Sequence, residues 1–175
     1  MKKSVRLTIY HAKQCDPKRC TGLKLKRHAL ARVVTSIRFL PRRAIVLNPF
    51  GKIAFSPADR QRIQDFGLAA LDCSWAHAQK VLSTHVKGTS RCLPILIAGN
   101  PTNYAKATKL STVEALAGAL YIAGFKEEAE KVLSIFVWGH TFLELNADLL
   151  AAYAGAKDST EILNIQSGVV GKETE

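Results

Sequence analysis

The stretch LAALDCSWA, residues 68–76, decides the fold of this 175-residue chain. Residues 68–71 form a short apolar run, which is typical of a strand buried on both faces. Asp72 follows, a residue type that often caps a helix, and a helical segment begins near Trp75. The stretch therefore predicts a buried strand that leads directly into a helix, with an acid and an indole at the end of the strand.

The flanking segments repeat this alternation of strands and helices. We expect strands at 4–10, 43–49 and 91–105, helices at 25–39 and 56–67, and a loop at 11–25. The helix at 56–67 has the clearest boundaries, because Ser56 is a candidate N-cap and Pro57 suits the first helical position. Strands and helices in alternation predict a parallel sheet with helices on its faces.

The second half of the chain has a different pattern. Helices are predicted at 111–124, 127–139 and 142–155, and residues 165–175 are expected to be a frayed tail. The first of these helices begins with a capping box of Ser111 and Glu114. The prediction is thus an α/β fold with a parallel-sheet N-terminal half, residues 1–92, and a mainly helical half, residues 93–175.

Positive charge is concentrated at the N-terminus. The formal net charge is +11, and residues 1–43 hold thirteen Lys and Arg against one acid, Asp16. The remaining 132 residues are almost neutral, with twelve basic and thirteen acidic side chains. A basic segment beside a neutral body favours a polyanionic partner, and nucleic acid fits better than an acidic membrane surface.

Several classes of protein are disfavoured by missing patterns. No run of about 18 apolar residues is present, so we expect no membrane span, and a cytoplasmic protein is the default prediction. The four cysteines match no paired CxxC zinc pattern, which favours free thiols and no metal. No GxGxxG, GxxxxGK[ST], GxSxG or HExxH motif occurs, and the five histidines are expected to be packing or surface residues.

Three segments rich in small polar residues are predicted to meet at one edge of the sheet. They are 47–51, 71–76 and 98–104, each at the carboxyl end of a predicted strand. Ligands bind at this edge in open parallel sheets, so we expect a pocket there, with Leu47, Pro49 and Trp75 as apolar walls. Purely structural roles remain possible for two of these residues: Asp72 could cap a helix, and Trp75 could pack in the core.

The same blocks resemble a known family. LDCSWA (71–76), LPILIAGNPTNYAKATKLSTVEALAGALYIAG (93–124) and FVWGHTFLELNADLLAAY (136–153) are similar to the small-subunit (16S/18S) rRNA aminocarboxypropyltransferases of archaea and eukaryotes. DPKRCTGLKL (16–25) and AIVLNPFG (44–51) also look like this family. The resemblance runs from about residue 6 to residue 153. The absence of a long acidic tail makes the chain similar to the archaeal members.

The resemblance implies a fold, a cofactor and a reaction. The fold would be related to the knotted, SPOUT-like RNA methyltransferases, with a trefoil knot. The 3-amino-3-carboxypropyl (acp) group of S-adenosylmethionine would be transferred to N3 of a (N1-methyl)pseudouridine in small-subunit rRNA, releasing methylthioadenosine, without a metal. Two alternative functions remain open: a methyltransferase with the knotted fold, and a non-catalytic assembly factor that binds rRNA.

The resemblance also carries roles onto particular positions of this sequence. Asp72 would face the substrate as a base or an orienting group. The residues implied for the cofactor are Thr21, Leu47, Pro49, Leu71, Trp75, Ala78, Leu93, Thr108 and Thr112. The basic residues expected to bind rRNA phosphates, as part of the pre-ribosomal small subunit, are Lys18, Arg19, Lys24, Lys26 and Arg27.

Two positions depart from the pattern of the family. Ala105 stands where a glycine is common, and Thr108 stands where an aromatic residue is frequent. Backbone contacts to the cofactor tolerate such replacements, whereas a stacking role at Thr108 does not. The helical half is also expected to leave the protein a monomer, although related methyltransferases are often dimers.

Overall fold

A computed structural model describes residues 4–83 and 86–172, and within them five strands form one parallel sheet. The strand order is β2-β1-β4-β3-β5, and every pairing is parallel, which confirms the predicted sheet. The strands are β1 Leu7–His11, β2 Arg32–Val34, β3 Ile45–Leu47, β4 Leu68–Asp72 and β5 Thr89–Arg91. The strand predicted from LAAL is β4, and it lies in the middle of the sheet.

The two faces of the sheet are buried in two separate apolar clusters. Ile9, Leu47 and Ala70 point to the face that packs against the helical half of the chain. Tyr10 and Ala69, one position along their strands, belong to the smaller cluster on the opposite face. This alternation follows the two-residue period of a strand, and burial on both faces explains why β4 reads as a continuous apolar run.

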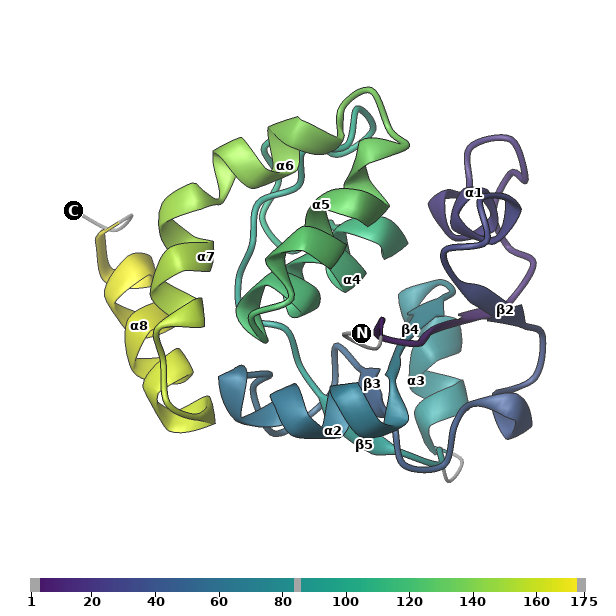
Figure 1. The fold of residues 1–175 in the computed structure, drawn as a ribbon, viewed down its shortest axis with the longest axis horizontal. Helices are drawn as coiled ribbons and strands as arrows, with labels where there is room; N and C mark the ends of the chain where they lie inside the picture. The colour runs from purple at the N-terminus through teal and green to yellow at the C-terminus, as the bar shows by residue number, and fades with distance from the viewer. Residues whose placement is uncertain (1–3, 84–85, 173–175) are drawn as a thin grey trace.

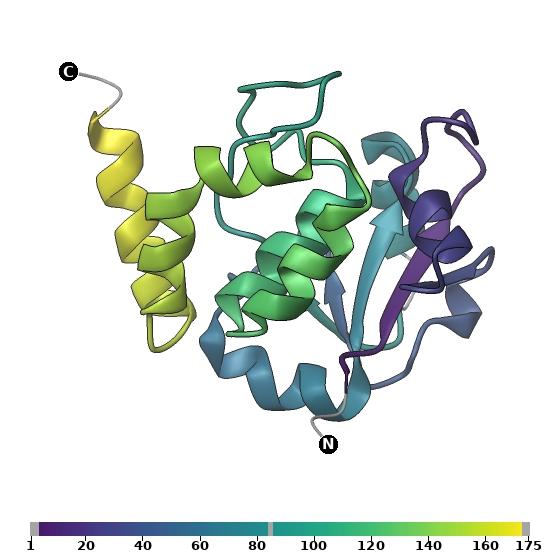
Figure 2. The ribbon, with the colours of Figure 1, turned by 45° about the horizontal axis from the view of Figure 1, so that its top comes forward.

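The helices surround this sheet. They are α1 Thr21–Arg27, α2 Arg60–Phe66, α3 Trp75–Ser83, α4 Thr112–Ile122, α5 Lys126–Ser134, α6 Gly139–Leu145, α7 Ala147–Ala154 and α8 Ser159–Lys172, with short 3-10 turns η1 Ile37–Phe39 and η2 Pro57–Asp59. Figure 1 and Figure 2 show α4 and α5 close to the sheet, with α7 and α8 on the side away from α1. No helix among the described residues is long and apolar enough to cross a membrane.

One apolar cluster joins the two halves that the sequence analysis divided after residue 92. It contains Ile9 and Leu68 from the sheet together with Leu116 from α4, Tyr153 from α7 and Ile162 from α8. The sheet ends at Arg91, close to the predicted division. The division itself therefore remains a prediction, because the core continues across it.

The helix predicted at 25–39 is wrong. The helix in this region, α1, begins earlier and ends at Arg27, and residues 32–34 form the edge strand β2. Ala29 adopts a φ of 56°, a left-handed conformation that an α-helix cannot contain. The β-branched pair Val33 and Val34 then pairs with β1, so strand pairing outweighed the helical spacing of the apolar residues.

The strand predicted at 91–105 is also wrong beyond its first residue. β5 is Thr89–Arg91, and the apolar run after it lies outside the sheet. On one side its backbone groups bond to side chains from the helical half. Asn146 pairs with both N–H and C=O of Ile97, and Tyr153 donates to the carbonyl of Ile95. On the other side, Leu96 and Ala98 bond to the backbone of residues 105–108, so the run finds its hydrogen-bond partners without joining the sheet.

The C-terminal predictions need two further corrections. The helix expected at 142–155 is interrupted at Asn146, between α6 and α7, where the side chain of Asn146 is used to hold Ile97. The expected frayed tail is the second half of α8 as far as Lys172. Gly168 and Gly171 weaken the helical pattern of this segment, and the helix is mostly exposed beyond Gln166, which accepts a hydrogen bond from Ile95 N. The helix predicted at 111–124 is confirmed as α4.

Candidate functional site

A cavity of about 520 Å³ opens at the carboxyl ends of β3, β4 and β5. Its walls come from the turn after β3, the end of β4, residues 92–95 after β5, and the segment 108–112 that leads into α4. The volume is in the range of pockets that hold small ligands, and the position is the one expected for a ligand site in a parallel sheet. We call it the strand-end cavity.

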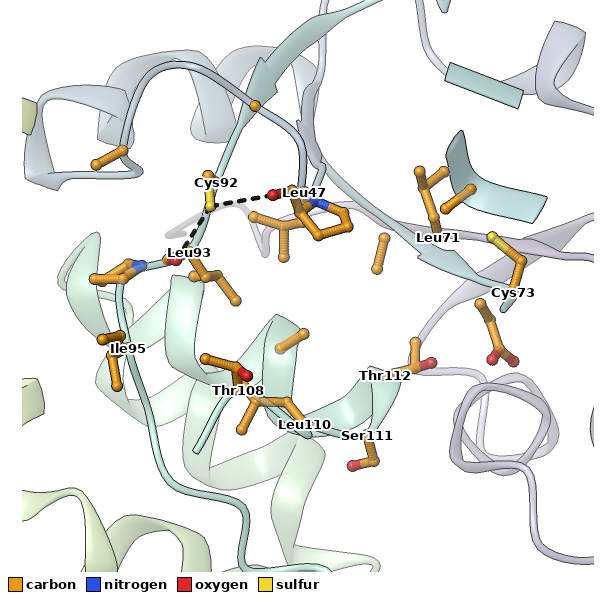
Figure 3. A pocket seen from close by; sticks show the side chains of 18 of the residues that line it. Leu47, Leu71, Cys73, Cys92, Leu93, Ile95, Thr108, Leu110, Ser111 and Thr112 are labelled. Atoms are coloured by element: carbon orange, nitrogen blue, oxygen red, sulfur yellow. Dashed lines mark hydrogen bonds between the residues drawn. The ribbon is translucent and has the colours of Figure 1, made fainter. Parts of the chain in front are cut away.

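Most of the residues expected at the cofactor line this cavity. Figure 3 shows Leu47, Leu93, Thr108 and Thr112 arranged around an open centre, with Leu71 at one side. The expected residues that line the strand-end cavity are Leu47, Pro49, Leu71, Asp72, Ala78, Leu93, Thr108 and Thr112. The lining is thus apolar on the sheet side and polar near the start of α4.

Three of the expectations are not confirmed by the strand-end cavity. The side chain of Trp75 lies outside the described residues, so its stacking role stays a prediction. Thr21 lines a neighbouring cavity, and its hydroxyl accepts a hydrogen bond from Val113 N at 3.2 Å. The segment 98–104 is not the third strand end; residues 92–95 take that place, and residues 100–103 line the neighbouring cavity instead.

The neighbouring cavity, about 620 Å³, is basic and partly aromatic. Lys18, Arg19 and Lys24 from the N-terminal segment line it, opposite Phe136 and Trp138. The Lys24 ammonium lies 4.7 Å from the centre of the Phe136 ring, a cation–π contact. The other two basic residues expected at RNA, Lys26 and Arg27, are exposed on α1. We call this the basic cavity.

The two cavities meet at the start of α4, because Ser111 lines both of them. Ser111 caps α4, and the buried carboxylate of Glu114 accepts hydrogen bonds from Ser111 N at 2.7 Å and Gly99 N at 2.7 Å. It also accepts from the N–H and the side-chain amide of Asn100. Glu114 therefore fixes the loop that borders the basic cavity to the helix that borders the strand-end cavity.

Two of the residues in this region have unusual backbone conformations. Ala105 has a φ of 61° and Thr108 a φ of 62°. Glycine adopts such angles without strain, whereas alanine does not, so Ala105 is a position that glycine would suit better. A positive φ costs more conformational energy for a β-branched residue, so Thr108 is a strained position on the wall of the strand-end cavity.

Four side chains that could bind a metal converge beside Asp72. The donor atoms of His11, Cys15, Cys20 and Asp72 all lie within 4.8 Å of one another. The Cys20 thiol donates to Asp72 Oδ2 at 3.0 Å, and His11 Nε2 lies 3.1 Å from Cys15 Sγ. Burial and the hydrogen bond to Asp72 raise the pKa of the Cys20 thiol well above its usual range. Burial likewise raises the pKa of Cys15, and the Asp72 charge adds to the effect.

Sequence reasoning missed some of the residues that shape the site. Leu163 and Gln166 of α8 line the strand-end cavity, and Gln166 lies in the segment 165–175 for which the sequence predicts a frayed tail. Gln166 also accepts a hydrogen bond from Ile95 N at 2.9 Å. His11 was treated as a packing histidine, and nothing in its spacing from Cys15 indicated that Asp72 would join them. These contacts depend on tertiary structure that no local pattern encodes.

Comparison with known proteins identifies relatives of the whole chain. A family model described as "Ribosome biogenesis protein, C-terminal" matches residues 45–170, and one described as a possible Fer4-like domain in RNase L inhibitor matches residues 5–36. The 16S rRNA aminocarboxypropyltransferase of Methanosarcina mazei is 50% identical over 94% of this chain and 95% of its own length. The corresponding protein of Methanothermobacter thermautotrophicus is 47% identical over 95% of this chain and 99% of its own length.

A solved structure extends the likeness to the fold. The SAM-dependent rRNA:acp-transferase Tsr3 from Vulcanisaeta distributa superposes with a TM-score of 0.83 at 43% sequence identity. The match covers 90% of this chain and 86% of that one. The chain belongs to the 16S rRNA aminocarboxypropyltransferase family.

Proposed function

We propose that this protein transfers the 3-amino-3-carboxypropyl group of S-adenosylmethionine to N3 of a pseudouridine, or N1-methylpseudouridine, in 16S rRNA and releases methylthioadenosine. Membership of the family makes it a SAM-dependent rRNA aminocarboxypropyltransferase. The finer statement concerns the acceptor atom and the by-product. In this step the N3–H proton leaves, an N3–C bond forms, and the bond from that carbon to sulfur breaks, which turns the sulfonium into a thioether.

The observation that carries the proposal is the meeting of the two cavities at Ser111. The adenosine part of the cofactor fits the apolar side of the strand-end cavity, between Leu47 and Leu93. Its amino acid arm then extends toward Thr112 at the positive end of α4, which favours a carboxylate. The rRNA approaches from the basic cavity, where Lys18 and Arg19 are available for phosphates.

Positioning decides which carbon of the sulfonium reacts. Three carbons are bonded to sulfur, and the one held in line with the nucleophile is attacked. Ala78 is buried on the wall near β4, where it would shield the methyl group, and Trp75 is proposed to stack beside it. The acp carbon would then be the one presented toward the basic cavity, and this arrangement favours acp transfer over methyl transfer.

Asp72 is proposed to orient the pseudouridine or to accept its N3 proton. It lies at the end of β4, lines the strand-end cavity, and its side chain is 19% exposed. The contacts of its carboxylate with His11, Cys15 and Cys20 all use Oδ2. Oδ1 takes part in none of these contacts, so it is the oxygen that we assign to the substrate.

The decisive experiment uses S-adenosylmethionine labelled in its carboxyl carbon and small-subunit RNA from a strain that lacks this enzyme. Label in the RNA together with free methylthioadenosine supports acp transfer. S-adenosylhomocysteine without label in the RNA would instead mean methyl transfer. Binding of the RNA without any binding of S-adenosylmethionine would leave a non-catalytic assembly factor. Digestion of the labelled RNA to nucleosides then identifies the modified base.

We also propose that the fold is related to the knotted, SPOUT-like RNA methyltransferases and contains a trefoil knot. The all-parallel sheet and a cofactor cavity built from three chain segments at its carboxyl edge support the relation. A disulfide engineered between the chain ends provides the test. A closed knotted ring, once denatured, has a smaller hydrodynamic radius than an unknotted ring of equal length, and equal radii would refute the knot.

A monomer in the cytoplasm is the proposed working state. The helical half already packs on the face of the sheet that carries Ile9 and Ala70. That packing removes one apolar face that a dimer could otherwise use, and 16S rRNA is assembled in the cytoplasm. Light scattering on the protein, alone and with S-adenosylmethionine, should give the mass of one chain, 19.1 kDa.

A further inference from the structure

The cluster of His11, Cys15, Cys20 and Asp72 has the composition of a metal site. It offers one imidazole nitrogen, two sulfurs and one carboxylate oxygen, which are the three kinds of ligand that zinc prefers. The residues come from the end of β1, the loop 12–20 and the end of β4. His11 and Cys20 are buried, and Cys15 and Asp72 are half-buried, so the donors face one another more than solvent.

The distances between the donors fit a single tetrahedral ion. Bonds of about 2.0 Å to nitrogen or oxygen and about 2.3 Å to sulfur place tetrahedral ligands roughly 3.3 to 3.8 Å apart. Here Asp72 Oδ2 lies 3.0 Å from Cys20 Sγ, 3.8 Å from Cys15 Sγ and 3.7 Å from His11 Nε2. The separations of Asp72 Oδ2 from Cys20 Sγ, 3.0 Å, and of His11 Nε2 from Cys15 Sγ, 3.1 Å, are both below this range, and the four donor atoms together lie within 4.8 Å of one another. Binding of an ion therefore requires the side chains to move by roughly half an ångström to one ångström.

An iron–sulfur cluster does not fit the same residues. The family model matching residues 5–36 describes a possible Fer4-like domain, and clusters of that type are held by four cysteine thiolates. Residues 5–36 contain only Cys15 and Cys20. The other two cysteines, Cys73 and Cys92, are not part of the converging group. Half of the required thiolates are therefore missing, whereas four donors of mixed type suffice for one ion.

We propose that His11, Cys15, Cys20 and Asp72 bind one divalent metal ion, with Zn²⁺ the best match to the ligand set. Binding replaces hydrogen bonds by coordinate bonds: the two thiols lose their protons to solvent, the imidazole binds through Nε2, and the carboxylate through Oδ2. Two thiolates and one carboxylate around Zn²⁺ leave a net charge of −1. No electron transfer is involved, because zinc has no redox chemistry in proteins.

The ion would tie the basic loop to the sheet. Between the two cysteines the chain turns at Asp16, whose carbonyl accepts from Cys20 N, and this turn carries Lys18 and Arg19. The loop already has one anchor to the segment after β4, the bond from Ser74 N to the side chain of Gln14. A metal ion adds cross-links between the loop, β1 and β4. It would hold Lys18 and Arg19 at the rim of the basic cavity.

The proposal also bears on Asp72, and only this consequence rests on the proposed function. An ion bound through Oδ2 fixes the carboxylate and leaves Oδ1 directed away from the cluster. In the metal-bound protein Asp72 would then act on the pseudouridine as an orienting group more than as a base, since the charge of the ion makes its carboxylate a weaker proton acceptor.

Metal binding can be measured without the transfer reaction. The full-length protein, stripped with a chelator under reducing conditions, is titrated with Zn²⁺ in competition with a chromogenic chelator, and then with Co²⁺ as a spectroscopic probe. We expect one Zn²⁺ per chain, and with Co²⁺ we expect sulfur-to-metal charge-transfer bands and intense tetrahedral absorption. Cys15→Ser and His11→Ala should each weaken Zn²⁺ binding by roughly 100-fold or more.

Cys92→Ser is the matched control, because it leaves the same number of thiols as Cys15→Ser but lies outside the cluster. It should bind Zn²⁺ like the wild type. Far-UV circular dichroism checks folding, and Cys15→Ser is the mildest variant because Cys15 is in a loop and is half-buried. Equal Zn²⁺ affinity in the wild type and Cys15→Ser, or an octahedral Co²⁺ spectrum, would overturn the proposal. Iron and sulfide in equal amounts in protein purified without oxygen would also overturn it.

Discussion

His11 and Asp72 are register partners at the ends of β1 and β4, and His11 Nε2 lies 3.7 Å from Asp72 Oδ2. Side chains at matching positions of neighbouring parallel strands project from the same face, so the pairing follows from the register of the sheet. It brings the N-terminal segment, which holds most of the positive charge, to the acid that lines the strand-end cavity. The basic N-terminal segment and the strand-end cavity are therefore joined through one pair of neighbouring strands.

Replacing Asp72 separates binding from chemistry. Asp72→Asn should leave the affinity for S-adenosylmethionine within about threefold, because the apolar wall and the start of α4 are unchanged. Transfer of labelled acp to RNA should fall by roughly 100-fold or more, the usual range for loss of a positioned acid or base. Calorimetry and the label assay measure the two quantities. Asp65→Asn removes an exposed acid of α2 as a control, and normal transfer by Asp72→Asn would refute the role.

Removing one charge from the basic cavity should change the salt dependence of RNA binding. Lys18→Gln is expected to weaken binding of the small-subunit rRNA hairpin and to reduce the slope of log K against log[salt] by about one. Lys157→Gln removes an exposed charge between α7 and α8, two helices that lie on the opposite side of the molecule from α1 (Figure 1), and should leave the slope unchanged. Fluorescence anisotropy at several salt concentrations measures both. Equal slopes would place the RNA elsewhere.

Glu114 should be important for stability beyond its role as a helix cap. Its carboxylate is fully buried and accepts five hydrogen bonds, from Gly99, Asn100 and Ser111. Glu114→Gln turns one acceptor into a donor that faces other donors, so we expect a loss of about 3 kcal/mol in the free energy of unfolding. Urea denaturation gives this value. Glu144→Gln changes an exposed carboxylate and serves as the control. If Glu114→Gln lost no more free energy of unfolding than Glu144→Gln, the stabilising role of Glu114 would be refuted.

Backbone strain at position 105 predicts a stabilising substitution. Ala105 is exposed and has a φ of 61°, so Ala105→Gly relieves left-handed strain and should raise the free energy of unfolding by about 0.5 to 1 kcal/mol. Ala107 is exposed, lies two residues on, and is not among the residues with positive φ. Ala107→Gly should therefore destabilise by a similar amount. Thermal denaturation of both variants should show shifts of opposite sign.

The buried hydroxyl of Tyr153 should make the protein less stable at alkaline pH. Its side chain is fully buried and donates to Ile95 O at 3.1 Å, and burial raises its pKa from 10.0 to about 12. A raised pKa contributes stability that is complete below pH 10 and is lost as the pH rises toward about 12. Tyr153→Phe should flatten this part of the curve, measured by urea denaturation at several pH values. Tyr104→Phe, which alters an exposed ring, should keep the wild-type slope.

The parallel sheet and its ligand edge could be predicted from the sequence because the signals are local. The apolar run 68–71 and the change of pattern at Asp72 are contained in nine residues, and Leu47 and Pro49 follow another such run. Once three strands are parallel, their carboxyl ends must lie at one edge. The resemblance to a family then supplied individual positions, such as Leu93 and Thr108, that line the cavity but have no pattern of their own.

The remaining errors arise where distant side chains override a local pattern. The apolar run after Arg91 resembles a strand, but Asn146 and Tyr153 take up its backbone groups from more than 45 residues away. Residues 165–175 resemble a frayed end because of their glycines, but α8 continues to Lys172, and Gln166 within it bonds to Ile95 N, 71 residues away. The convergence of His11, Cys15, Cys20 and Asp72 could not be predicted for the same reason, because Asp72 is 52 residues from Cys20 along the chain.

The wall of the strand-end cavity has its hydrogen-bond partners at the end of the chain. Ile95 and Ile97 are held by Asn146, Tyr153 and Gln166, which are synthesised after all five strands of the sheet. A nascent chain can therefore form its sheet early but lacks a finished cavity for the cofactor until α8 has been made. The proposed cofactor site is thus completed later in synthesis than the sheet that carries it.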